Sequence, residues 1–132
     1  KTENAGEQKP TQCSQKIAPI TPQRKLNGDS IVLTLYYITL NNADEAQKIS
    51  HDLLNHQFAV CTNWFPITCA YRWDGEVKQE SEVVLIVKSK SSQRDNIETT
   101  IKNHISYTHC IAELGTTFTN LPFLNWLNKE VC

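Results

Sequence analysis

Three side chains that bind soft metal ions lie close together in the sequence, at the end of a predicted helix and the start of a predicted strand. They are His104, His109 and Cys110. Imidazole nitrogen and thiolate sulfur suit copper or zinc, so the group is a candidate site for Cu(II) or another divalent cation. The alternative is that these residues do not form a metal site. A histidine at a helix C-terminus interacts favourably with the helix dipole. Adjacent residues on a strand, such as His109 and Cys110, point to opposite faces.

The chain has five cysteines, which is more than a cytosolic protein of this size normally carries, and none of them forms a C-x-x-C pair. Structural zinc is therefore not predicted, because its ligands usually come in close pairs. The odd count leaves at least one thiol free or bonded between chains. Cys13 and Cys132 lie in the terminal segments and are a candidate disulfide pair. Buried or free thiols are an equal alternative for all five.

Sequence patterns of catalysis are missing. The chain has no nucleophile-elbow serine, no phosphate-binding glycine loop and no paired-carboxylate motif, so we predict that it is not an enzyme. Its 13 basic and 14 acidic residues and its pI of about 6.5 argue against binding to nucleic acid or to an anionic membrane. No apolar run approaches the roughly 18 residues of a membrane span, so direct membrane insertion is not expected.

Apolar periodicity predicts the elements that would position these side chains. In order, they are a strand over 30–38, a helix from Asn42, strands over 59–73 and 76–89, a helix from Ser92, a strand over 109–114 and a helix over 123–130. The first strand is a continuous apolar run, typical of burial on both faces or of a central position. Asp74-Gly75 predicts a tight hairpin between the two long strands. Pro66 predicts that one of these strands lies at a sheet edge or contains a bulge.

The order β-α-β-β-α-β with a helical tail predicts an α+β fold, the ferredoxin-like sandwich, with the first and third strands central. Residues 1–28 show no apolar periodicity and contain three prolines, so they are predicted to be a mobile N-terminal leader, with the domain over 29–132. The chain starts at Lys1 and has no methionine, as a processed, exported protein or a trimmed chain would. We expect a secreted or periplasmic location, with a cytoplasmic one as the alternative.

One motif carries a family resemblance. The pattern A-x-C-x-N-x-x-P followed by Y-x-W-x-G-x-(I/V) is met by Ala59, Cys61, Asn63, Pro66, Tyr71, Trp73, Gly75 and Val77. With this motif, the segment 30–128 resembles the CutA (divalent-cation tolerance) family. The resemblance implies a homotrimer related in shape to PII signalling proteins, in which the long hairpin reaches neighbouring subunits. It also implies a role in divalent-metal, chiefly copper, tolerance in bacteria and in acetylcholinesterase anchoring and processing in animals, with no enzymatic reaction.

The resemblance also indicates where metal ligands would lie. In bacterial members the proposed ligands are a cysteine on the first strand and a histidine and a glutamate around the motif H-P-Y-x-x-P-E. In this chain those positions fall near Ile38, at Ile105 and at about Ile111, and only Tyr107 of the motif is kept. The metal ligands of the family are therefore not expected here.

A ligand-binding cleft is predicted from three other residues. Trp73 and Tyr107 are aromatic members of the family pattern, and Lys88 follows an apolar run. Together they could line a cleft between subunits, with the ammonium facing an anionic group. Interface packing of the two aromatic rings and an amphipathic lysine at a strand end are the alternative.

Two further hypotheses concern assembly. Cys61 or Cys69 on the edge strand could bond to Cys110 of another subunit, provided that this strand meets the last strand of its neighbour. As an alternative function, the trimer would be a scaffold or anchor whose leader or hairpin recruits a partner protein.

Overall fold

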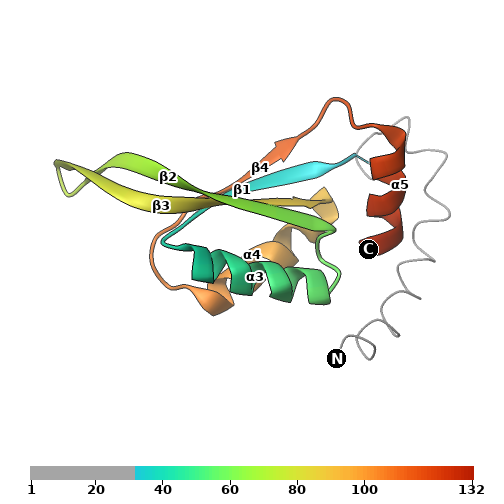
Figure 1. Ribbon diagram of the computed structural model, residues 1–132, viewed down its shortest axis with the longest axis horizontal. Coiled ribbons are helices and arrows are strands. Elements are labelled where there is room, and N and C mark those ends of the chain that lie inside the picture. Colours follow the sequence, from blue (N-terminus) through green and yellow to red (C-terminus); the bar gives the residue numbers. More distant parts are fainter. Residues whose placement is uncertain (1–31) are drawn as a thin grey trace.

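The computed structural model of the chain describes residues 32–132, which form a four-stranded antiparallel sheet of strand order β2-β3-β1-β4. Helices α3 and α4 cover one face of the sheet (Figure 1). The predicted ferredoxin-like arrangement, with β1 and β3 central, is confirmed. The predicted leader 1–28 lies outside the described residues. The elements are β1 (Thr34–Leu40), α3 (Ala43–Asn55), β2 (Cys61–Trp73), β3 (Glu76–Ser89), η1 (Ser91–Gln93), α4 (Arg94–His104), β4 (Ile111–Gly115) and α5 (Leu121–Glu130).

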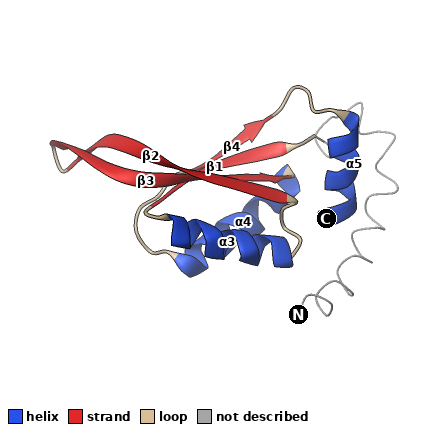
Figure 2. Cartoon of the chain, in the orientation of Figure 1, coloured by secondary structure: helices blue, strands red, loops and turns tan. Residues whose placement is uncertain are grey.

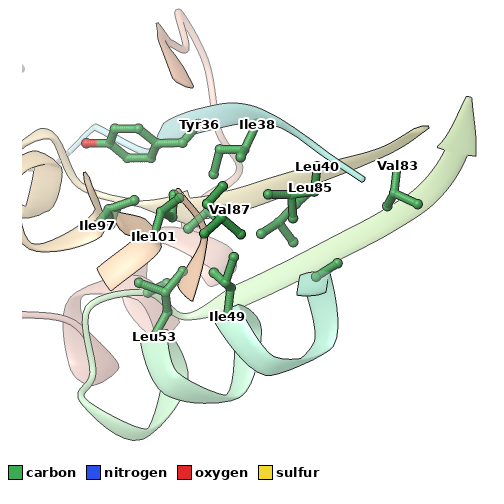
Figure 3. Packing of buried hydrophobic residues seen from close by; sticks show 13 residues of the cluster. Tyr36, Ile38, Leu40, Ile49, Leu53, Val83, Leu85, Val87, Ile97 and Ile101 are labelled. Atoms are coloured by element: carbon green, nitrogen blue, oxygen red, sulfur yellow. The ribbon is translucent and has the colours of Figure 1, made fainter. Parts of the chain in front are cut away.

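The main core lies between the sheet and these two helices (Figure 3). Along β1, Tyr36, Ile38 and Leu40 are buried toward the helices, whereas Tyr37 is 37 % exposed on the other side. Of the two alternatives predicted for the first strand, the central position is the one observed, because α3 and α4 cover only one face of the sheet (Figure 1). We call the other side, which carries Tyr37, Phe65 and Leu114, the open face of the sheet.

Both helices present the predicted apolar stripe to the sheet. Ile49 and Leu53 of α3 and Ile97 and Ile101 of α4 have no exposed surface. Leu54 is apolar as well, but it is 36 % exposed, because it lies one residue, or about 100°, around the helix from Leu53.

Several element boundaries differ from the predictions. β2 starts at Cys61 instead of residue 59. β1 starts at Thr34 instead of residue 30, since its ladder with β3 begins at the pair Thr34–Ser89. α4 starts at Arg94, because Ser91–Gln93 forms a 3₁₀ turn ahead of it. β4 starts at Ile111 instead of residue 109, so two predicted strand residues belong to the preceding connection.

The β2–β3 hairpin is regular along its whole length and extends beyond the helix layer (Figure 2). Asp74 (φ 52°) and Gly75 (φ 80°) both have positive φ, which confirms the predicted tight turn. Pro66 lies in an edge strand, which is one of the two predicted alternatives, and no bulge interrupts the register there. Because β1 ends opposite Val83, residues Glu76–Glu82 of β3 pair with β2 alone. The outer half of the hairpin therefore stands clear of the main core.

A second, smaller core forms where α5 packs against the base of the sheet. It consists of Leu33, Val60, Leu127 and Val131. α5 starts two residues before its predicted start, because Pro122 is well accommodated in the first turn of a helix. None of the helices between residues 32 and 132 has the length and apolar composition needed to cross a membrane.

An ion pair joins α4 to the edge strand β4. Arg94 donates two hydrogen bonds to the Glu113 carboxylate, one from Nε to Oε1 at 2.8 Å and one from Nη2 to Oε2 at 2.7 Å. These bonds hold the pKa of Glu113 below its ordinary value. A carboxyl with a lowered folded-state pKa stabilises the fold above its unfolded pKa. That contribution is lost as the pH falls through the folded pKa.

We expect the Glu113→Gln variant to lose less stability than the unmodified chain between about pH 6 and pH 3. The effect is small, because the Arg94 side chain is 60 % exposed and solvent screens the pair. Thermal unfolding measured across this pH range checks the prediction. Glu98→Gln is the control, since Glu98 pairs with Lys102 within a single helix. Parallel pH curves for the unmodified chain and Glu113→Gln would contradict it.

Candidate functional site

A cavity of about 920 Å³ opens where the outer hairpin meets the connection between α4 and β4. One wall is formed by open-face side chains of the hairpin. The other is formed by residues 106–110 and the end of β1. The lining residues are Thr39, Asn41, Cys69, Tyr71, Trp73, Lys78, Glu80, Glu82, Ser106, Tyr107, Thr108, His109 and Cys110.

His109 and Cys110 are held in this wall by backbone contacts. The Cys110 amide donates to Thr39 Oγ1, and the Thr39 amide donates to the Cys110 carbonyl, both at 3.2 Å. His109 Nδ1 lies 2.9 Å from the carbonyl oxygen of Tyr107. Because a carbonyl can only accept, Nδ1 carries the proton of the neutral ring and Nε2 keeps its lone pair. The wall thus offers one imidazole nitrogen and one free, exposed thiol.

Tyr107 ties the same connection to the start of α3. Its hydroxyl donates to Glu45 Oε1 at 2.5 Å and accepts from the Asn41 amide at 2.9 Å. Asn42 caps the helix, since its side-chain oxygen accepts from the Glu45 amide at 2.9 Å, which agrees with the predicted start of this helix at Asn42. Burial, followed by the hydrogen bond to Glu45, raises the pKa of Tyr107. The Tyr107 hydroxyl is therefore neutral and is engaged in holding the connection in place.

The hairpin wall carries carboxylates that suppress ionisation of their neighbours. A hydrogen bond to Glu80 raises the pKa of Tyr71, and local desolvation adds to the effect. Desolvation, followed by the charge of Glu82, raises the pKa of the Cys69 thiol. Cys69 therefore stays protonated at neutral pH, which makes it a weaker nucleophile and metal ligand than an ordinary thiol.

The structure brings two of the three predicted ligand-binding residues together. Trp73 and Tyr107 both line the cavity. Lys88 does not, because it lies at the base of the hairpin, where its Nζ is 5.7 Å from the ring centre of Phe123 in α5. The lysine in the cavity is Lys78, which was not among the predicted site residues. The two-residue turn could have revealed it, since that turn fixes the register that places Lys78 opposite Tyr71.

The three predicted metal ligands also lie at two separate places in the structure. His109 and Cys110 share the cavity wall, but His104 Nε2 lies 2.9 Å from Asp52 Oδ2, where it links α4 to α3. His56 contacts the other carboxylate oxygen of Asp52 at 3.0 Å. Among residues 32–132, no three histidine, cysteine, aspartate or glutamate side chains are arranged to hold a metal ion.

Fold and cavity together define a class of protein: a ferredoxin-like α+β domain with an extended hairpin and an open, polar cavity at its side. Comparison of the sequence with models of protein families identifies one family within this class. The model described as CutA1 divalent ion tolerance protein matches residues 34–130. The chain belongs to this family.

Individual relatives agree with the assignment. The divalent-cation tolerance protein CutA of Archaeoglobus fulgidus is 32 % identical over 96 residues, which cover 72 % of this chain and 94 % of that protein. The corresponding protein of Thermotoga maritima is 30 % identical over 100 residues, covering 75 % and 99 %. The solved structure of the periplasmic CutA from Archaeoglobus fulgidus matches with a TM-score of 0.72 at 30 % identity, covering 74 % and 97 %. A relative from Oryza sativa is named chloroplastic, so the names of relatives span more than one compartment.

The metal-ligand positions implied by the family resemblance hold apolar side chains here. Ile38 has no exposed surface, and Ile105 is 7 % exposed in the same core. Ile111 is partly buried and packs against that core. None of the three side chains has an atom that can donate electrons to a metal, so a site built from side chains at these positions does not fit this chain.

Proposed function

We propose that the chain is a subunit of a homotrimeric, non-enzymatic divalent-cation tolerance protein, and that its hairpin cavity takes up a divalent cation such as Cu(II). Membership in the CutA1 family and the names of its relatives support the cation-tolerance role. The single observation that carries the cation site is the pairing of His109 and Cys110 in one wall of the cavity.

Assembly is supported by the surfaces that a single chain leaves uncovered. Tyr37, Phe65 and Leu114 are 37 %, 43 % and 49 % exposed on the open face. The long edge strand β2 has no partner on its outer side within residues 32–132. An exposed edge next to exposed aromatic groups would promote uncontrolled association, and closure by further copies of the chain would remove both hazards.

The cavity donors suit a soft or borderline cation. Nε2 of His109 and the thiol of Cys110 are ligands that copper prefers, and the carboxylates of Glu80 and Glu82 make the opposite wall acidic. Because no three donors converge among the described residues, a captured cation would complete its coordination with water or with a neighbouring copy. Trp73 and Tyr71 would then form an aromatic rim around the site rather than coordinate the cation.

We expect native mass spectrometry with added Cu(II) to show about one bound ion per chain. His109→Ala or Cys110→Ser is expected to weaken binding by at least about tenfold, since loss of even a supporting group commonly has that effect. His104→Ala is the matched control, because its imidazole is engaged by Asp52 away from the cavity. An absence of bound copper, or equal losses in all three variants, would overturn the cation site.

A further inference from the structure

The hairpin cavity is larger than a metal ion requires. Its volume is about 920 Å³, within the roughly 300–1,000 Å³ of pockets that hold small organic molecules. A fully hydrated cation would fill only about 200 Å³, since each water takes up about 30 Å³. The hairpin wall also carries both kinds of charge, the Lys78 ammonium and the carboxylates of Glu80 and Glu82. The cavity therefore has space and charge for an organic ligand with a cationic and an anionic end.

The spacing of these charges along β3 indicates how long such a ligand is. Lys78, Glu80 and Glu82 follow one another on the open face, with Lys78 nearest the turn. Because a strand rises about 3.3 Å per residue, the Cα atom of Lys78 lies about 7 Å from that of Glu80 and about 13 Å from that of Glu82. A free amino acid carries both charges on one carbon atom and is shorter than this separation. An extended di- or tripeptide is about 7–10 Å long, so its two termini match the charges.

Lys78 is available for the carboxylate of an incoming peptide. Its Nζ lies 3.9 Å from Glu76 Oε1, and the two side chains are 42 % and 74 % exposed. A long ion pair in solvent contributes little, so a peptide carboxylate can replace Glu76. Lys78 lies opposite Tyr71 and diagonal to Trp73, a distance that aromatic and long side chains bridge. The carboxylate end of the ligand would therefore lie beside two aromatic rings.

The other groups of the cavity suit the body of a peptide. The Trp73 side chain is 50 % exposed, and an apolar side chain of the ligand would remove part of its ring from water. Ser106 and Thr108 contribute hydroxyl groups to the opposite wall, and a hydroxyl can donate to or accept from a peptide group. The cavity thus has a partner for each part of a short peptide.

We infer that the hairpin cavity binds di- and tripeptides that have a free amino terminus and an apolar C-terminal residue. The terminal carboxylate pairs with Lys78, and the last side chain lies against Trp73. The terminal ammonium faces the carboxylates of Glu80 and Glu82. This peptide site goes beyond the proposed cation site and does not depend on the metal ligands named for it.

Isothermal titration calorimetry on the full chain tests for this ligand, in buffer with EDTA so that metal ions do not contribute. We expect Ala-Ala-Phe to bind at least about tenfold more tightly than its C-terminal amide or its N-acetyl form, because each change removes a charged hydrogen bond. Free phenylalanine should bind as weakly as the blocked peptides. Equal affinity of Ala-Ala-Phe and either blocked form, or no binding of Ala-Ala-Phe, would overturn the peptide site. A failure of the cation site would instead appear as an absence of bound Cu(II), with this result unchanged.

A lysine variant tests the role of Lys78. In Lys78→Met the preference for Ala-Ala-Phe over its amide is expected to fall from at least about tenfold to about one, because the ammonium that distinguishes the two is gone. Lys88→Met is the matched control, since Lys88 lies further along the same face of β3 and contacts Phe123 outside the cavity. It should keep the full preference. A preference that persists in Lys78→Met, or is lost equally in both variants, would overturn the assignment.

A tryptophan variant tests the contact with the last side chain. Trp73→Ala is expected to lower the preference for Ala-Ala-Phe over Ala-Ala-Ala by at least about fivefold, because the ring that covers the phenyl group is removed. Trp64→Ala is the control, since Trp64 is 38 % exposed in the same strand but lies opposite Leu85, on the side of the helices. An unchanged preference in Trp73→Ala would overturn this placement of the peptide. So would an equal loss in the two variants.

Discussion

Replacing Leu85 with alanine is expected to lower the free energy of unfolding by about 2–5 kcal/mol. Leu85 has no exposed surface and lies in the central strand β3, opposite Ile38 on β1 and Trp64 on β2. Its side chain fills the space between the sheet and both helices, so truncation removes apolar contacts and leaves a cavity that the surrounding strands cannot close. Since a domain is stabilised by only about 5–15 kcal/mol, this loss is a large fraction of the total.

The same strand provides the control. Val77 is 71 % exposed in the outer hairpin, where β3 pairs with β2 alone, and Val77→Ala should change stability by less than about 0.5 kcal/mol. Chemical denaturation of the three proteins checks both expectations. It must be done at one protomer concentration, because association adds to apparent stability. A loss below about 1 kcal/mol for Leu85→Ala would contradict the assignment of the core.

Much of the fold was predictable because its signals are local. Asp74-Gly75 requires a tight turn, and a two-residue turn fixes the register of every pair in the hairpin. Ile97 and Ile101 recur at helical spacing and are both buried on α4. Such patterns act within a few residues, so they can be recognised before any long-range contact is known.

Boundaries were less predictable because distant partners decide them. The apolar run that starts at residue 30 gave no indication that pairing begins at Thr34, since that limit is set by Ser89 on β3. Likewise, His109 and Cys110 precede β4 instead of starting it. The β4 ladder with β1 ends at the pair Ile38–Ile111, and the Cys110 amide donates to the side-chain oxygen of Thr39, seventy-one residues earlier, instead of to a backbone carbonyl. A pattern within one segment contains no information about these partners.

In the candidate site, too, some residues could be placed from local patterns and others only from tertiary contacts. The hairpin register alone would have assigned Lys78 to the face that carries Tyr71. The contacts of two other predicted site residues depend on tertiary structure. Tyr107 bonds to Glu45, sixty-two residues away, and Lys88 lies against Phe123 of α5. No spacing rule within either segment predicts these contacts.

Replacing Phe65 with aspartate is expected to convert the proposed trimer to monomers while leaving each subunit folded. Phe65 is 43 % exposed on the open face of the edge strand β2, where the proposed assembly would bury it. An aspartate there would be buried without a partner, at a cost of several kcal/mol per subunit. Every 1.4 kcal/mol is a factor of ten, so association should weaken by about 100-fold or more.

Leu54→Asp is the matched control for this change. Leu54 is 36 % exposed on α3, on the opposite side of the molecule from the open face, so the same charge should leave the assembly intact. Light scattering coupled to size-exclusion chromatography measures the mass of each variant, and circular dichroism verifies that the subunits stay folded. Dissociation in Phe65→Asp alone is expected, because the proposed assembly covers the open face and leaves the exposed side of α3 uncovered. A trimer that persists in Phe65→Asp, or one lost equally in both variants, would contradict this interface.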